Sequence, residues 1–147
     1  MVEELETTQA DFDSIAMMGL DDGFNLAPVE LARVLQLGRD KSAKCVSYFI
    51  DGELVAIAGF IVECLLDDNA HMWLVTAHAA KRHRVAFARH SKEAQAKLPY
   101  RTVSCFCDPS FAHTLRWLEW LGFSRVGEQD IAGRTFITLL REKPHGH

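Results

Sequence analysis

The chain has 147 residues, of which 16 are basic and 20 acidic, so its formal net charge is −4. A chain of this length fits one domain whose core needs no disulfide bonds. The net negative charge argues against a general nucleic-acid or anionic-membrane binder. The cysteines, Cys45, Cys64, Cys105 and Cys107, lack the C-x-x-C spacing of a zinc or redox site, so we expect buried thiols in a reducing cytosol.

We expect a cytoplasmic chain, because the sequence shows neither a secretory signal nor a membrane span. Residues 1–8 are acidic and polar rather than basic and then apolar, so no secretory signal is visible. No apolar run approaches the ~20 residues that a membrane span needs. No repeat or linker divides the sequence. We therefore predict a single domain over residues 1–147, with about 142–147 as a flexible tail.

The first half of the chain predicts two helices and then three strands. Apolar spacing indicates helices over residues 12–19 and 28–38. Residues 45–50 and 54–63 are rich in β-branched and aromatic residues, and Asp51-Gly52 between them is typical of a two-residue hairpin turn. The short apolar run over residues 71–76 predicts a third strand at the centre of the sheet.

The second half predicts a helix over residues 85–98 that ends before Pro99, a strand over 103–107 and a helix over 111–121. Two last strands, 123–129 and 135–141, form a hairpin. The predicted fold is α/β (α+β) in the order α-α-β-β-β-α-β-α-β-β. Its sheet is mixed and mainly antiparallel, flanked by helices, with strands 71–76 and 103–107 as a central parallel pair.

A run of four basic residues, Lys81, Arg82, His83 and Arg84, precedes the helix predicted from residue 85. This placement is unusual, because a helix N-terminus carries about half a positive charge and attracts acidic residues. An anion would offset the repulsion, and free helix N–H groups beside cations form a phosphate site. The alternative is that the basic side chains spread into solvent on an exposed loop.

The element order, the strand-loop-helix over residues 72–98 and the segment Leu115-Arg-Trp-Leu-Glu-Trp-Leu-Gly-Phe123 resemble the GCN5-related N-acetyltransferase (GNAT) superfamily. Residues 84–91 and 116–123 more closely resemble the acetyltransferase-like internal virion (core) protein A family of short-tailed bacteriophages. The resemblance implies an acyl-CoA-binding N-acetyltransferase-like protein. Its alternative is a non-enzymatic phage protein that uses the scaffold in virion assembly, to bind a phage structural or a host protein.

For the cofactor, the resemblance implies acetyl-CoA. Its pyrophosphate would lie on the family's Q/R-x-x-G-x-G/A loop, which corresponds here to Lys81, Arg82, His83, Arg84, Val85 and Ala86. Its pantetheine arm would align on the central strand, at Leu74, Val75 and Thr76. Arg84 stands where the family has its first glycine, so this side chain either crowds the pyrophosphate or pairs with it.

The resemblance also implies where catalysis would occur. Leu118 takes the position of the tyrosine that protonates the coenzyme thiolate, and Cys105, Cys107 and Ser110 stay open as replacements. Glu63, at a strand end, is a candidate general base acting through water; the alternative is a carboxylate in solvent.

Other residues have structural explanations beside functional ones. His71 and His78 flank the central strand and either titrate near neutral pH or form structural hydrogen bonds. The histidine spacing matches no metal motif, so no metal site is predicted. Trp117 and Trp120 either cover the sheet or form an exposed aromatic platform for a partner.

Overall fold

The computed structural model describes residues 2–18, 36–62, 68–77, 79–107, 109, 112–131 and 133–142. Glu63, Cys64, His78, Ser110, residues 28–35 of the second predicted helix and residues 143–147 of the predicted tail lie outside the described residues. The contacts divide the chain into two compact units. The first is Met1–Ile61 with Trp73–His90, and the second is Val62–Met72 with Ser91–His147. That the chain is a single domain stays a prediction.

The chain begins with a strand that the sequence did not reveal. β1 (Val2–Glu6) pairs antiparallel with β2 (Lys44–Ile50), with Glu4 opposite Tyr48. Most of β1 is exposed, so its sequence lacks the alternation that marks a half-buried strand. Backbone pairing at an edge, rather than burial of its side chains, holds this strand in place.

Helix α1 (Gln9–Met18) starts three residues before the predicted helix. Its start is a capping box, in which the backbone N–H of Asp11 donates to Thr8 Oγ1 at 3.3 Å and that of Thr8 donates to Asp11 Oδ2 at 2.9 Å. The second predicted helix is described only over residues 36–41, and it continues past Gly38, where we expected it to end.

The predicted hairpin of β2 and β3 (Glu53–Ile61) is confirmed. Asp51 and Gly52 both have positive φ, 52° and 81°, which is the backbone of a two-residue type I′ turn. The core of this unit joins α1, β3 and the segment around β4 (Asn69–Thr76). Its fully packed members are Phe12, Leu54, Ile57, Val75 and Ala77.

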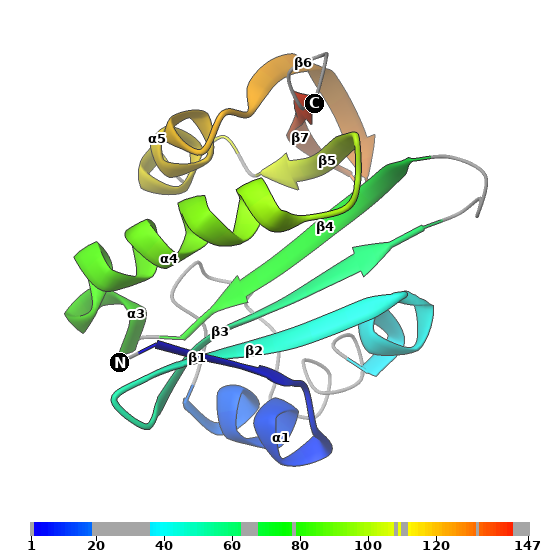
Figure 1. The fold of residues 1–147 in the computed structure, drawn as a ribbon. Helices are drawn as coiled ribbons and strands as arrows, with labels where there is room; N and C mark the ends of the chain where they lie inside the picture. The colour runs from blue at the N-terminus through cyan, green and yellow to red at the C-terminus, as the bar shows by residue number, and fades with distance from the viewer. Residues whose placement is uncertain are drawn as a thin grey trace. The chain divides into compact units, whose positions relative to one another are not determined.

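After β4 come a short helix α3 (Ala79–Arg82) and the long helix α4 (Arg84–Lys97). The remaining elements are β5 (Thr102–Cys107), α5 (Ala112–Trp120), β6 (Ser124–Ile131) and β7 (Arg134–Glu142). Figure 1 shows α3 beside the turn that joins β2 and β3. Because β7 extends to Glu142, this residue belongs to the sheet and not to the predicted tail.

Within the described residues, seven strands form one sheet in the order β1-β2-β3-β4-β5-β7-β6. Strands β4 and β5 are parallel, as predicted, while β1–β2, β2–β3, β5–β7 and β6–β7 are antiparallel. The mixed, mainly antiparallel fold is thus confirmed, with β1 and α3 added to the predicted order. In the second unit, α5 buries Leu115 and Leu118, Leu121 directly after the helix is buried too, and Val103 and Leu139 are buried completely.

Candidate functional site

The predicted basic turn is mostly helical. Lys81 and Arg82 end α3, His83 alone forms the turn, and Arg84 is the first residue of α4. The N–H of Phe87 donates to the carbonyl of His83 at 2.9 Å, so His83 is the N-cap residue of α4. The correction has a local cause, because Ala79 and Ala80 favour a helical turn before the chain enters α4.

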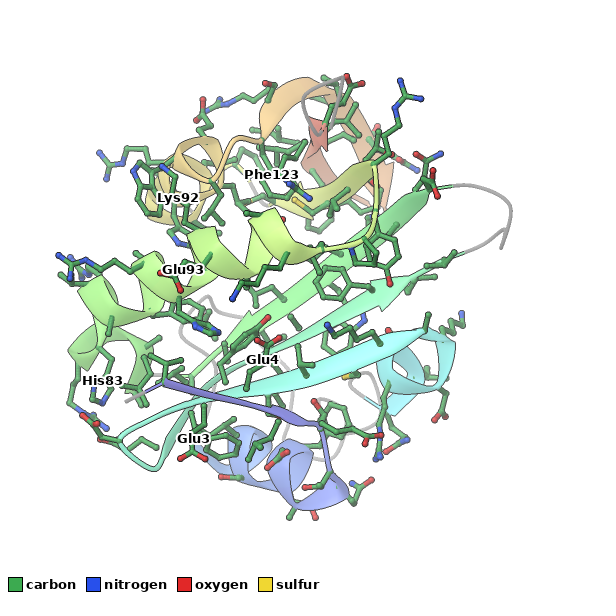
Figure 2. All side chains as sticks on the ribbon, in the orientation of Figure 1. Glu3, Glu4, His83, Lys92, Glu93 and Phe123 are labelled. Atoms are coloured by element: carbon green, nitrogen blue, oxygen red, sulfur yellow. The ribbon has the colours of Figure 1, made fainter. Side chains whose placement is uncertain are left out.

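Arg82 and His83 share one partner within the chain, the carboxylate of Glu53. Glu53, the first residue of β3, accepts a hydrogen bond from Arg82, and its Oε1 lies 3.3 Å from His83 Nε2. The hydrogen bond from Arg82, and then that from His83, lower the pKa of the Glu53 carboxyl below its ordinary value. The Glu53 carboxylate therefore offsets part of the positive charge of the basic segment. His83, labelled in Figure 2, lies at this end of the first unit.

The other cations project from the same segment. Lys81 and Arg84 are exposed, and no ion pair of Arg84 occurs among the described residues. Val85 follows with 65% of its surface exposed, and Ala86 is half-buried. The first-turn N–H groups of a helix have no acceptor within the helix. The start of α4 therefore combines backbone donors, an exposed guanidinium and small neighbouring side chains, which suits a phosphate group.

The predicted pantetheine strand is the last part of β4. Val75 is buried in the core beside Ala77, whereas Leu74 and Thr76 are half-buried. In the second unit, parallel pairs join Asn69–His71 with Thr102–Ser104. The β4–β5 ladder thus ends at His71, five residues before the end of β4 at Thr76.

The described acid candidates are poor proton donors. Leu118, at the position of the family's tyrosine, is only 3% exposed and belongs to the core of the second unit. Burial, and secondarily the charge of Cys107, raise the pKa of Cys105 to about 12. Cys107 is buried as well. A thiol with such a pKa gives up its proton less readily than an ordinary cysteine does.

Two further side chains have structural roles. His71 Nδ1 lies 3.1 Å from Ser104 Oγ, and the imidazole ring lies against Phe106, with 4.8 Å between ring centroids. These contacts support the structural explanation of this histidine. Trp120 is 47% exposed, with Lys92 Nζ 4.4 Å from its ring centroid, while Trp117 is half-buried. The indole of Trp120 is thus exposed, and the ammonium group of Lys92 lies over its ring.

Two further features of the first unit were not predicted from the sequence. Glu53 is one; its position directly after Asp51-Gly52 is the signal that would place it at the hairpin end of the sheet. The other is a hollow of about 530 Å³ at the opposite end of β2, lined by Glu4, Leu5, Glu6, Thr7, Arg39, Ser42, Ala43, Lys44, Cys45 and Val46. None of the predicted coenzyme residues lines this hollow.

Among the described residues, no group of three or more His, Cys, Asp or Glu could hold a metal ion. No helix in the described part of the chain is both long and apolar enough to cross a membrane.

The strand order, the central parallel pair and the helix that follows β4 define the GNAT fold. Aminoglycoside acetyltransferase AAC(6')-Ib in complex with coenzyme A is similar, with 13% identity and a TM-score of 0.74 over 97% of this chain and 95% of that one. The same enzyme in a complex with acetyl-CoA has 13% identity and a TM-score of 0.73, over 97% and 93% of the two chains.

A chimera of spermidine N-acetyltransferase SpeG from Vibrio cholerae and hSSAT has 12% identity and a TM-score of 0.68, over 96% of this chain and 95% of that one. The sequence matches no protein-family model, and comparison with curated proteins gives no match either. At these identities the similarity is one of fold, and it extends over nearly the whole chain.

Proposed function

We propose that the protein is an acyl-CoA-binding, N-acetyltransferase-like protein that holds the pyrophosphate of acetyl-CoA at the start of α4. The observation that carries this proposal is the position of Arg84. It is exposed, has no ion pair among the described residues, and begins the helix that directly follows the central strand and α3. Similar structures solved with acetyl-CoA or coenzyme A support the choice of ligand.

Within this proposal, each predicted residue has a task. The N–H groups of Val85 and Ala86 and the side chains of Lys81 and Arg84 bind phosphate oxygens, with Arg82 and His83 as neighbouring cations. The backbone of Leu74, Val75 and Thr76 aligns the pantetheine arm.

Acetyl transfer joins an amine nitrogen to the thioester carbonyl carbon, breaks the carbon–sulfur bond, and moves a proton from the amine to the leaving sulfur. We propose that Glu63 takes the amine proton through water. No replacement for the missing tyrosine is favoured, because the side chain of Leu118 has no ionisable proton and the pKa of Cys105 is about 12. The departing thiolate is then protonated by solvent, and we expect slow turnover.

Isothermal titration calorimetry with coenzyme A tests the phosphate site. We expect Arg84→Glu to weaken binding at least about tenfold, because it replaces a phosphate-pairing cation by a repelling charge. Arg89→Glu is the matched control, since Arg89 is an exposed residue further along α4 and the change in net charge is the same. Equal affinities of Arg84→Glu and wild type would show that the start of α4 does not bind the phosphates.

A second candidate function is a non-enzymatic one. As this alternative, we propose that the protein is phage-encoded and acts in the host cytoplasm or in the virion, as a morphogenesis protein that binds a phage structural or host protein. The buried leucine at position 118 favours this alternative, because it removes the acid of the acetyltransferase reaction. Co-purification with identified phage structural proteins from infected cells, lost on Trp120→Ala, would support it.

A further inference from the structure

We propose that Glu53 is an internal competitor of the coenzyme phosphates: its carboxylate holds Arg82 and His83 until the phosphates displace it. This inference rests on the proposed function of the α4 start. It assigns a role in ligand affinity to a residue outside the predicted loop, on the hairpin of β2 and β3.

The position of Glu53 is fixed by the backbone on both sides. It pairs with Ile50 in the β2–β3 ladder, directly after the Asp51-Gly52 turn. Two residues further on, the carbonyl of Val55 accepts a hydrogen bond of 2.9 Å from the N–H of Ala77, which leads into α3. The carboxylate is therefore built into the same end of the first unit as the basic segment.

The carboxylate bridges the side chains of Arg82 and His83 with separate oxygens. Glu53 Oε2 accepts from Arg82, and Oε1 lies 3.3 Å from His83 Nε2. Neither α3 nor α4 has an acidic residue in its first turn, although a helix start normally attracts one. Glu53 supplies the missing negative charge from another element. It does so where the proposed function places a pyrophosphate.

The ion pair is accessible enough to be exchanged. The side chain of Arg82 is 62% exposed and that of Glu53 is 41% exposed, so water and solutes reach both groups. Ion pairs of this exposure are weak, whereas a phosphate presents several charged oxygens to the same donors. Exchange of the carboxylate for a phosphate keeps a negative group beside Arg82 and His83. Because the phosphates must first displace Glu53, their affinity is lower than it would be without this carboxylate.

Titration calorimetry with coenzyme A, comparing wild type with Glu53→Gln, tests this competition. We expect Glu53→Gln to bind coenzyme A about three- to tenfold more tightly, because the amide neither repels the phosphates nor holds the two cations. Glu119→Gln is the matched control. It removes the carboxylate of another exposed ion pair, that with Arg125 at 3.0 Å, and should leave the affinity unchanged.

A second readout separates competition from a change in the fold. We expect the imidazole NMR signals of His83 in ligand-free Glu53→Gln to lie closer to those of the coenzyme-bound wild type than the signals of the ligand-free wild type do. Equal or weaker binding by Glu53→Gln, in a protein whose wild type binds coenzyme A, would overturn the competition alone. Absence of binding by both proteins would overturn the proposed phosphate site and this inference with it.

Discussion

The indole of Trp73 on β4 lies directly over Gly59 on β3, so that a Cβ atom at position 59 would come within 2.1 Å of Trp73 Nε1. The same Nε1 donates a 2.8 Å hydrogen bond to Ser42 Oγ, and the Ser42 hydroxyl donates to the carbonyl of Gly38 at 2.6 Å. The contact thus connects two strands of the first unit with the end of the helix over residues 36–41. Glycine at position 59 is what makes room for this indole.

We therefore expect Gly59→Ala to lower the free energy of unfolding by about 1–3 kcal/mol, because the indole must move and its hydrogen bond to Ser42 must weaken. Urea denaturation followed by circular dichroism measures this loss. Gly127→Ala is the control, since no atom lies within 4 Å of a Cβ built there. A Gly59→Ala protein as stable as this control would show that the indole does not occupy the position described.

Arg141 on β7 is a buried cation. It is 7% exposed, its Nε and Nη2 atoms have no hydrogen-bond partner among the described residues, and burial lowers its pKa. We expect Arg141→Met to leave the free energy of unfolding unchanged or to raise it by about 1–3 kcal/mol, because a buried, unsatisfied guanidinium is costly. Denaturant unfolding tests this. A destabilisation of more than about 1 kcal/mol would mean that the guanidinium is satisfied in solution.

The carboxyl of Glu53 should make stability depend on acid pH. Its pKa in the folded protein is lowered from an ordinary 4.5, first by the hydrogen bond from Arg82 and then by that from His83. A lowered pKa means that the carboxylate stabilises the fold above pH 4.5, and that this contribution is lost as the pH falls through the folded-state value.

The stability difference between wild type and Glu53→Gln should therefore be small and constant near neutral pH and should disappear in acid. Urea unfolding of both proteins at a series of pH values measures it. A difference that persists unchanged below the pKa of the carboxyl would indicate that Glu53 acts through packing rather than charge.

The thiols of the described cysteines should differ in reactivity. Cys105 is buried with a pKa of about 12, whereas Cys45 is half-buried and burial raises its pKa less. Because the thiolate is the reactive form, we expect maleimide to modify Cys45 before Cys105 in the folded protein. Peptide mass spectrometry after timed labelling, compared with labelling in guanidinium chloride, measures both rates. Modification of Cys105 as fast as in the unfolded chain would contradict its burial.

The order of the elements was predictable where apolar residues recur with a clear helical or strand period. The Asp51-Gly52 turn and the apolar runs around it fix the hairpin, and the change to a helical period after residue 84 fixes α4. Strand β1 was not predictable, because an exposed edge strand is held by its backbone and leaves no pattern in its side chains. A strand of this kind is recognised only in the structure, from its pairing with a neighbouring strand.

The candidate site was predictable in part. The four basic residues are contiguous in the sequence, so an anion-binding segment could be proposed from residues 81–84 alone. The partner of Arg82 and His83 could not, because Glu53 is about thirty residues away and approaches only when β3 pairs in the sheet. Ion pairs between distant elements depend on strand register, which local patterns do not specify.

Binding of the acetyl-CoA phosphates at the start of α4 is tested most directly by thermal unfolding with and without this ligand. At ~100 times its dissociation constant, the ligand should add about 2.7 kcal/mol of stability and raise Tm by roughly 5–10 °C. We expect this shift in wild type and its loss in Arg84→Glu. An unchanged Tm of the wild-type protein at millimolar acetyl-CoA would contradict the claim, and would leave the scaffold to a role in protein binding.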